Sequence, residues 1–130
     1  MTRTNYLGGT WCLRAFLPAL EAAAPSDVVN VVSVAGTVTA GSGGPYTAAK
    51  HAQLAFSRSI AAELRPRGVR VHTILPGFVE TEGFPQRTRF GPRLSTFVVE
   101  PELVADRVLT ALDRDRGEVF VPRWYRIAPL

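Results

Sequence analysis

The sequence predicts an α/β fold in which helices cover the faces of a doubly wound parallel sheet. Helical and strand-like patterns alternate along 130 residues without an internal repeat or a linker, an order typical of parallel sheets with right-handed crossovers. The main strand-like segment is nearly continuous in apolar, β-branched residues, as expected where both faces of a sheet are covered. A composition of 46% hydrophobic and 20% charged residues suits one globular core.

The first half of the chain predicts a helix, a strand and a second helix. The first helix, over residues 3–24, carries apolar side chains at helical spacing and ends near Pro25. A strand follows over residues 27–34, and the Gly-, Thr- and Ser-rich segment 35–44 predicts a loop. Pro45 suits the first turn of the second helix, which extends over residues 45–64.

The second half of the chain predicts a strand, a long irregular segment, a helix and a short strand. These are expected over residues 69–75, 78–99, 100–114 and 118–122. Three strands are few for a doubly wound fold, which commonly has about six. We therefore expect residues 1–130 to form a single partial domain, the second half of such a fold with the amino-terminal half missing.

Charge and composition exclude several classes of protein. The net charge is +4, but the fourteen arginines are scattered, so nucleic-acid binding is not expected. Arg87, Arg89 and Arg93 do cluster without nearby acids; they either meet an anionic substrate or carrier or form a solvated face. No stretch is apolar enough for a membrane span. His51, His72 and the single cysteine have no metal-ligand spacing.

The amino terminus loosely imitates a signal peptide, but Arg14 and Glu21 interrupt the pattern. With one cysteine, the chain forms no internal disulfide, which fits a reducing compartment. We expect a cytoplasmic protein. Glu80 and Glu82 are interpreted as solvated rather than as an acid–base pair.

Three side chains are candidates for chemistry. Tyr46 and Lys50, the only lysine, lie four residues apart near the start of the second helix, a spacing that places them on one face. Ser33 stands at the end of the preceding strand, and open α/β sheets bind ligands beyond the carboxyl ends of their strands. A nearby cation lowers the pKa of a phenol, which suits proton exchange with a carbonyl or alcohol oxygen. The alternative is a strand-end serine beside a surface pair.

These residues belong to longer motifs. The first is Val29-Asn30-Val31-Val32-Ser33-Val34-Ala35-Gly36, Tyr46 and Lys50 follow, and the last is Pro76-Gly77-Phe78-Val79-Glu80-Thr81. Together and in this order they resemble the short-chain dehydrogenases/reductases, in particular the classical type. The resemblance covers nearly all of the chain and implies a Rossmann-like fold.

The resemblance implies a role for each matching residue. Tyr46 would be the general acid and base, Lys50 would lower its pKa and hold the nicotinamide ribose, and Ser33 would hold the substrate oxygen. Asn5 matches the position of a family asparagine that holds a water of the proton relay. It would complete a catalytic set with Ser33, Tyr46 and Lys50. The residues implied to bind the cofactor, NAD or NADP, are Tyr46, Lys50, Pro76, Gly77, Val79 and Thr81.

The chain departs from the family pattern in three places. Ala49 and Val32 replace serines that carry no proton, and the Gly-rich turn of the family's amino-terminal half is absent. Gly41-Ser42-Gly43-Gly44 is a poor substitute for a phosphate cradle, because Tyr46 occupies the third glycine position.

We therefore expect an oxidoreductase that interconverts a small carbonyl compound and an alcohol by hydride transfer with NAD or NADP. The alternative is a truncated, inactive chain that serves as a dimerising module. By resemblance, a homo-oligomer would form through the helices over residues 3–24 and 45–64. Phe84, Phe90 and Phe97 line an apolar substrate pocket or pack the loop that carries them.

Overall fold

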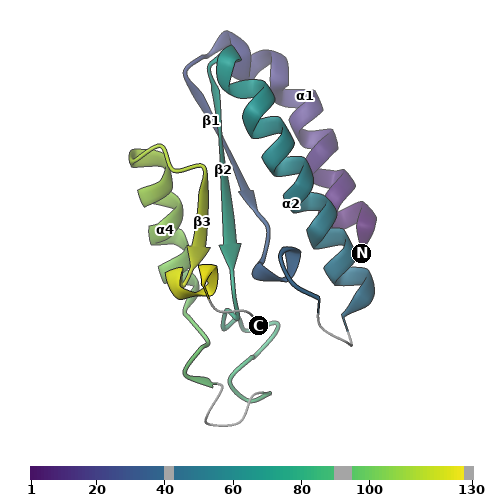
Figure 1. Cartoon of the computed structure of the whole chain (residues 1–130), viewed down its shortest axis with the longest axis vertical. Coiled ribbons are helices and arrows are strands. Elements are labelled where there is room, and N and C mark those ends of the chain that lie inside the picture. Colours follow the sequence, from purple (N-terminus) through teal and green to yellow (C-terminus); the bar gives the residue numbers. More distant parts are fainter. Residues whose placement is uncertain (40–42, 90–94, 128–130) are drawn as a thin grey trace.

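The parallel sheet predicted from the sequence is confirmed. A computed structural model describes residues 1–39, 43–89 and 95–127 (Figure 1). Within these ranges, strands β1 (Ser26–Val31), β2 (Val69–Pro76) and β3 (Glu118–Val121) form one sheet in the order β1-β2-β3. Both pairs are parallel, with Val31 opposite Ile74 and Pro76 opposite Val121. All three strands therefore end at the same edge of the sheet.

Three helices lie close to their predicted positions. They are α1 (Gly8–Ala22), α2 (Gly44–Leu64) and α4 (Pro101–Asp113). The first predicted helix has a different beginning, because Arg3–Leu7 forms a π-helical turn that leads into α1. The first strand is shorter than predicted, since Val34–Gly36 turns into a 3-10 helix.

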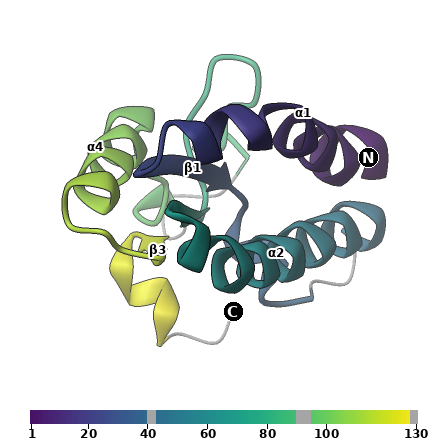
Figure 2. The same cartoon turned by 90° about the horizontal axis from the view of Figure 1, so that it is seen from above.

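The helices divide between the two faces of the sheet (Figures 1 and 2). Apolar residues of α1 and α2 pack with Val28, Val69 and Val71 on one face. Residues of α4 pack with Val29, Ile74 and Val121 on the other. Strand residues alternate between these two cores, as the pleat of a strand requires. At the end of β1 the α4 face is less covered, because Val31 is 50% exposed.

Hydrogen bonds fix α2 to β1 and β2. Asn30 on β1 donates to Ser57 on α2 (2.9 Å), and the Ser57 hydroxyl also bonds to that of Thr73 on β2 (2.7 Å). Ser57 and Thr73 are fully or almost fully buried, so this polar chain satisfies groups that would otherwise be costly to bury. It holds α2 at a fixed position along the sheet.

A second polar network lies on the α4 face, near the amino-terminal ends of the strands. Asp27 receives a hydrogen bond from Arg70 (2.7 Å) and lies 2.7 Å from Nε2 of the buried His72. Nδ1 of His72 donates to the carbonyl oxygen of Arg116 (2.9 Å). The hydrogen bond from Arg70 is the main cause that lowers the pKa of Asp27, with His72 adding to it against the effect of burial. The network ties β1 to β2 and to the turn before β3.

Acid should weaken this network. Because the pKa of Asp27 is lower in the folded chain than its ordinary 3.8, its stabilisation is present above about pH 4 and is lost as the pH falls through the folded value. We expect Asp27→Asn to lower the free energy of unfolding by about 1 kcal/mol at neutral pH, and this gap to close in acid. Urea denaturation of the original chain and the variant across the pH range measures the loss of free energy of unfolding and its decrease in acid.

The matched control for this prediction is Asp115→Asn. Asp115 pairs with Arg65 at the surface and has a positive φ of 46°, a conformation that asparagine tolerates. The hydrogen bond from Arg65 also lowers the pKa of Asp115, so its effect has the same direction with pH, but we expect it to be smaller because the pair is exposed to solvent. An Asp27→Asn gap that persists unchanged below about pH 3 would contradict the ionised network.

Candidate active site

The structure brings Ser33 to the carboxyl ends of β1 and β2. The ladder between the strands continues one residue past β1, because the Val32 N–H donates to the Ile74 carbonyl (2.8 Å). Ser33 follows, and its hydroxyl lies 3.4 Å from the Pro76 carbonyl oxygen, to which it donates. The same hydroxyl oxygen accepts from the Ala35 N–H (3.1 Å). Ser33 and Pro76 are therefore neighbours, as the sequence predicts for two strand ends at one edge.

Tyr46 and Lys50 lie in the first turns of α2 and share one face of the helix. Pro45 occupies the start of this helix, where its missing N–H costs no hydrogen bond. The Lys50 Nζ atom is 5.7 Å from the centroid of the Tyr46 ring, within the range of a cation–π interaction. Tyr46 is 36% exposed and Lys50 is 7% exposed. The phenol is thus accessible to a ligand, while the ammonium beneath it is shielded from water.

A glutamine that sequence reasoning missed holds the lysine. Nζ of Lys50 donates to Oε1 of Gln53 (2.9 Å), and Nε2 of Gln53 donates to the carbonyl of Val31 at the end of β1 (3.2 Å). Burial lowers the pKa of Lys50, and among the described residues no carboxylate forms an ion pair with it. Gln53 was detectable in the sequence only as the residue one turn after Lys50 on the same face.

Asn5 lies in the π-helical turn that precedes α1. Its main-chain and side-chain nitrogens both donate to the Met1 carbonyl, at 2.9 and 3.2 Å. Within the described ranges the structure records no bond from Asn5 to Ser33, Tyr46 or Lys50. The turn does approach α2, since the rings of Tyr6 and Phe56 meet edge-on at 5.9 Å. Single π-helical turns are frequent at functional sites.

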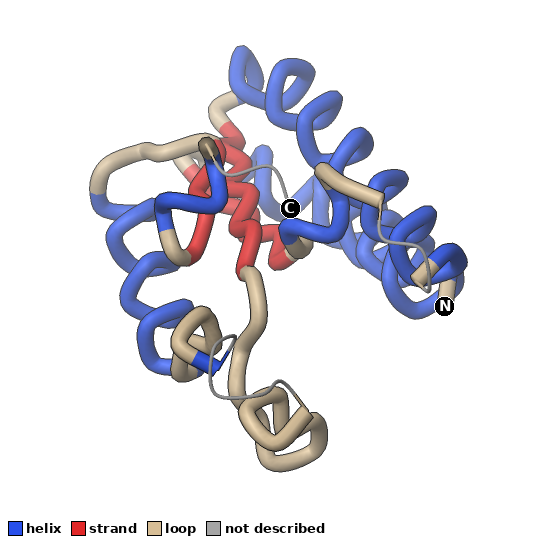
Figure 3. Tube along the Cα trace, turned by 60° about the horizontal axis from the view of Figure 1, so that its bottom comes forward, coloured by secondary structure: helices blue, strands red, loops and turns tan. Residues whose placement is uncertain are grey.

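The segment after β2 leads away from the sheet below the carboxyl edge (Figure 3). The Gly77 N–H donates to the Val121 carbonyl (2.8 Å), and Val79 pairs with Val99 across the loop. Thr81 is exposed, with its hydroxyl at a long 3.5 Å from the Phe84 carbonyl. Of the predicted cofactor residues in this segment, Pro76 is hydrogen-bonded to Ser33.

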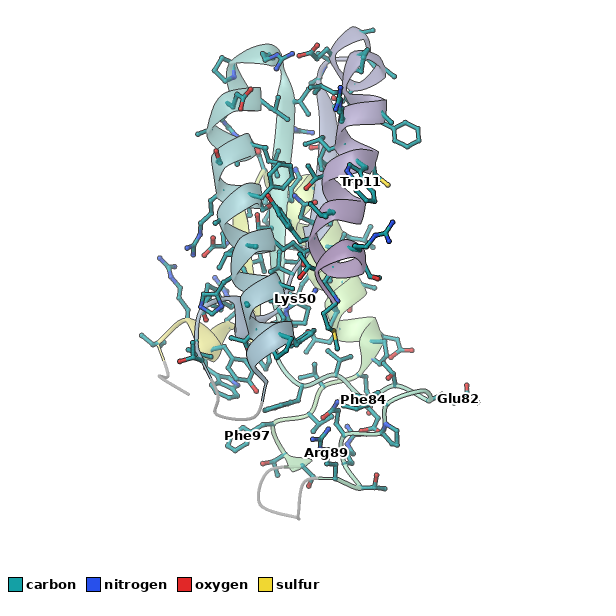
Figure 4. All side chains as sticks on the ribbon, turned by 90° about the vertical axis from the view of Figure 1, so that its right-hand side faces the viewer. Trp11, Lys50, Glu82, Phe84, Arg89 and Phe97 are labelled. Atoms are coloured by element: carbon teal, nitrogen blue, oxygen red, sulfur yellow. The ribbon has the colours of Figure 1, made fainter. Side chains whose placement is uncertain are left out.

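Glu80 organises part of the segment over residues 78–89. One carboxylate oxygen of Glu80 accepts from the N–H groups of Gln86 and Arg87, at 3.1 and 2.9 Å. The prediction that Glu80 is merely solvated is therefore wrong, because a carboxylate aimed at two main-chain N–H groups was not visible as a pattern. Glu82 is exposed, in agreement with its prediction (Figure 4).

The aromatic residues of this loop have different environments. Phe84 is exposed beneath the Arg89 guanidinium at 5.5 Å, whereas Phe97 packs against Trp124 at 5.2 Å. Figure 4 shows Lys50 at the lower end of α2, with the loop that carries these residues below it. The predicted candidates Gly41, Ser42, Phe90 and Arg93 lie outside the described residues.

Gly77 has a structural role that its motif did not reveal. Tyr125 is buried directly against it, so a Cβ atom at position 77 would collide with the tyrosine ring. Burial raises the pKa of Tyr125, and the nearby main chain of Phe78 partly opposes that rise. The ring also packs with Leu75 and Val32 in the core beneath the candidate site.

Substituting Gly77 should therefore damage the site through packing. We expect Gly77→Ala to lower the free energy of unfolding by about 2 kcal/mol, because the Tyr125 ring has to move. Gly83→Ala is the matched control, since nothing lies within 4 Å of a Cβ atom there. Thermal denaturation followed by circular dichroism compares the two variants. Equal losses of stability would refute the role assigned to Tyr125.

Two further searches of the described residues are negative. No group of three or more His, Cys, Asp or Glu side chains is arranged to hold a metal ion there. None of the described helices combines the length and apolar character that crossing a bilayer requires.

Solved structures share this arrangement of helices and strands. A short-chain dehydrogenase from Burkholderia cenocepacia in complex with NADP matches with a TM-score of 0.78 and 33% identity, over 92% of this chain and 47% of that one. A short-chain dehydrogenase from Sphingobium yanoikuyae in complex with NADPH also gives a TM-score of 0.78, with 26% identity, over 91% of this chain and 46% of that one. The predicted Rossmann-like class is thereby confirmed.

Curated relatives lead to the same family. A 1-deoxy-11-beta-hydroxypentalenate dehydrogenase of Streptomyces avermitilis is 35% identical over 119 residues, which are 89% of this chain and 43% of that protein. The 17-beta-hydroxysteroid dehydrogenase 13 of Mus musculus is 32% identical over 129 residues, 95% of this chain and 40% of that protein. The chain thus spans less than half the length of these relatives.

The family profile described as short chain dehydrogenase matches residues 1–90. These residues include Ser33, Tyr46 and Lys50. The chain belongs to the short-chain dehydrogenase family, whose members are oxidoreductases.

Proposed function

We propose that this chain carries the catalytic part of an NAD(P)-dependent oxidoreductase that interconverts a carbonyl compound and an alcohol. The observation that best supports the proposal is the position of three side chains at one sheet edge. Ser33 stands beside Pro76, and an exposed Tyr46 lies over the buried ammonium of Lys50. A hydroxyl, a phenol and a shielded cation are the groups that proton transfer to a carbonyl oxygen requires.

The residues present fit a nicotinamide dinucleotide. Nζ of Lys50 uses one of its three donors on Gln53, so two remain for ribose hydroxyls. Thr81 is exposed, and its hydroxyl would meet the carboxamide, with Pro76, Gly77 and Val79 along the nicotinamide. When bound, the dinucleotide supplies or accepts the hydride. The NADP and NADPH of the two solved relatives support this assignment.

The chain's own residues then manage the substrate oxygen and its proton. Ser33 turns its hydroxyl from the Pro76 carbonyl, a long bond of 3.4 Å, towards the carbonyl oxygen of the substrate. Tyr46 donates its phenolic proton to that oxygen in reduction and takes it back in oxidation. Lys50 stabilises the phenolate left behind, and Asn5 holds a water that returns the proton.

The first test measures binding of the dinucleotide. NADPH and NADH are titrated into the purified chain, shown to be folded by circular dichroism, and the nicotinamide fluorescence is followed. We expect saturable binding, weakened at least about tenfold by Lys50→Ala. Absence of binding up to millimolar concentration would leave the alternative of a chain without catalysis.

The second test measures the proton transfer. We expect Tyr46→Phe to reduce carbonyl reduction by NADPH about 10²- to 10⁴-fold, with binding of NADPH retained. Tyr6→Phe is the matched control, because the Tyr6 ring packs edge-on against Phe56 of α2. Equal rates in the two variants would exclude Tyr46 as the acid.

We also propose that the chain associates with a second copy through α1 and α2. Leu13, Leu17 and Leu20 of α1 face the core, yet Trp11 and Phe16 on the same helix are 53% and 64% exposed. A helix apolar on two sides favours a further partner. Sedimentation velocity of Trp11→Glu/Phe16→Glu should give a monomer where the original chain gives a dimer. A monomer in both would contradict the proposal.

A further inference from the structure

Unpaired arginines gather on the side of the molecule away from α1. The described arginines that form ion pairs are Arg58, Arg65, Arg67, Arg70 and Arg87. The arginines around α4, β3 and the turn after β3 have no ion-pair partner in the described ranges. They are Arg107, Arg114, Arg116, Arg123 and Arg126. These five carry more positive charge than the net +4 of the chain.

Four of these side chains line one cavity of about 140 Å³, whose remaining walls are Thr110 and Val119. Arg107 lies in α4, Arg114 directly after its last residue, Arg116 in the turn before β3, and Arg123 in the turn after β3. Figures 1 and 2 show α4 and β3 side by side. The arginines therefore come from separate segments that only the folded chain brings together.

The cavity has no acidic wall. A smaller neighbouring cavity of about 70 Å³ shares Arg116 and Arg123 and adds Arg126 and Glu118. Glu118 is already engaged by Arg58 through two bonds of 2.8 and 2.9 Å. The guanidinium groups consequently repel one another without compensation by a carboxylate at the cavity.

We infer that this arginine-lined cavity binds a phosphate group, separately from the proposed nicotinamide site. A planar guanidinium matches a phosphate by paired, charge-assisted hydrogen bonds, and Thr110 supplies a hydroxyl at the wall. The volume suits a phosphate or pyrophosphate group and is too small for a whole nucleotide. No aromatic ring lines the larger cavity, so stacking of nucleic-acid bases is not provided for.

A second copy of the chain does not suit this face. A two-fold contact uses the same patch of both copies, so it would bring two sets of arginines without ion-pair partners into one interface. A small multivalent anion instead neutralises several guanidinium groups at once. The occupant is therefore a phosphate, either inorganic or carried by a small phosphorylated molecule.

The test uses calorimetric titration of the folded chain with sodium pyrophosphate, inorganic phosphate and phenyl phosphate at low ionic strength, with sodium chloride as the screening control. We expect saturable binding with a Kd of about 1 mM or tighter for at least one of them. A response to phosphate and pyrophosphate alone indicates a free anion, and a response to phenyl phosphate indicates an ester.

The variant Arg116→Gln/Arg123→Gln should weaken that binding at least tenfold. Arg3→Gln/Arg14→Gln removes the same charge from exposed positions outside the cavity and should leave the Kd within about twofold, which tests general electrostatics. Arg107→Gln is a further variant should the first not fold. Lack of saturation, an equal loss in both double variants, tighter binding of a short oligonucleotide, or a dimer that the cavity variant abolishes would each overturn the inference.

Discussion

The candidate site depends on the parallel pairing of β1 with β2. With Val31 opposite Ile74, the two strands end together, and the chain leaving β1 passes beside the last residue of β2. Ser33 can then reach the Pro76 carbonyl. A shift of one residue would turn every side chain of β1 to the other face and separate Asn30 from Ser57, the contact that holds α2 in place.

Burial of Lys50 follows from the same arrangement. Gly36 lies against the main chain of Lys50, where a Cβ atom would come within 2.8 Å of the carbonyl oxygen. This close approach brings the segment after β1 onto α2 and helps to shield the ammonium. Burial therefore disfavours the charged form of Lys50. Within the described residues its position is maintained by packing and by Gln53 rather than by an ion pair.

Much of the fold was predictable from the sequence, because apolar runs, Pro45 and the glycine-rich segments mark the elements directly. The end of the first strand was not predictable from the sequence. Val32 and Val34 are buried in irregular backbone, and buried valines give the same apolar pattern whether or not they belong to a strand. The i, i+4 spacing was sufficient to predict that Tyr46 and Lys50 share a face. The bond of Gln53 to Val31 and the packing of Tyr125 on Gly77 join distant segments. The contacts of Glu80 depend on the path of an irregular loop, and no residue pattern encodes that path. The bonds of Asn5 to Met1 likewise required coordinates.

The outer edge of β1 favours association of the chain with other molecules. In the described residues β1 pairs with β2 alone, so main-chain donors and acceptors on its other side have no strand beside them, and Val31 is exposed at its end. An uncovered strand edge is a template for adding strands from other molecules. A lysine or proline on the outer edge of these six residues should therefore raise the concentration at which the chain stays in solution.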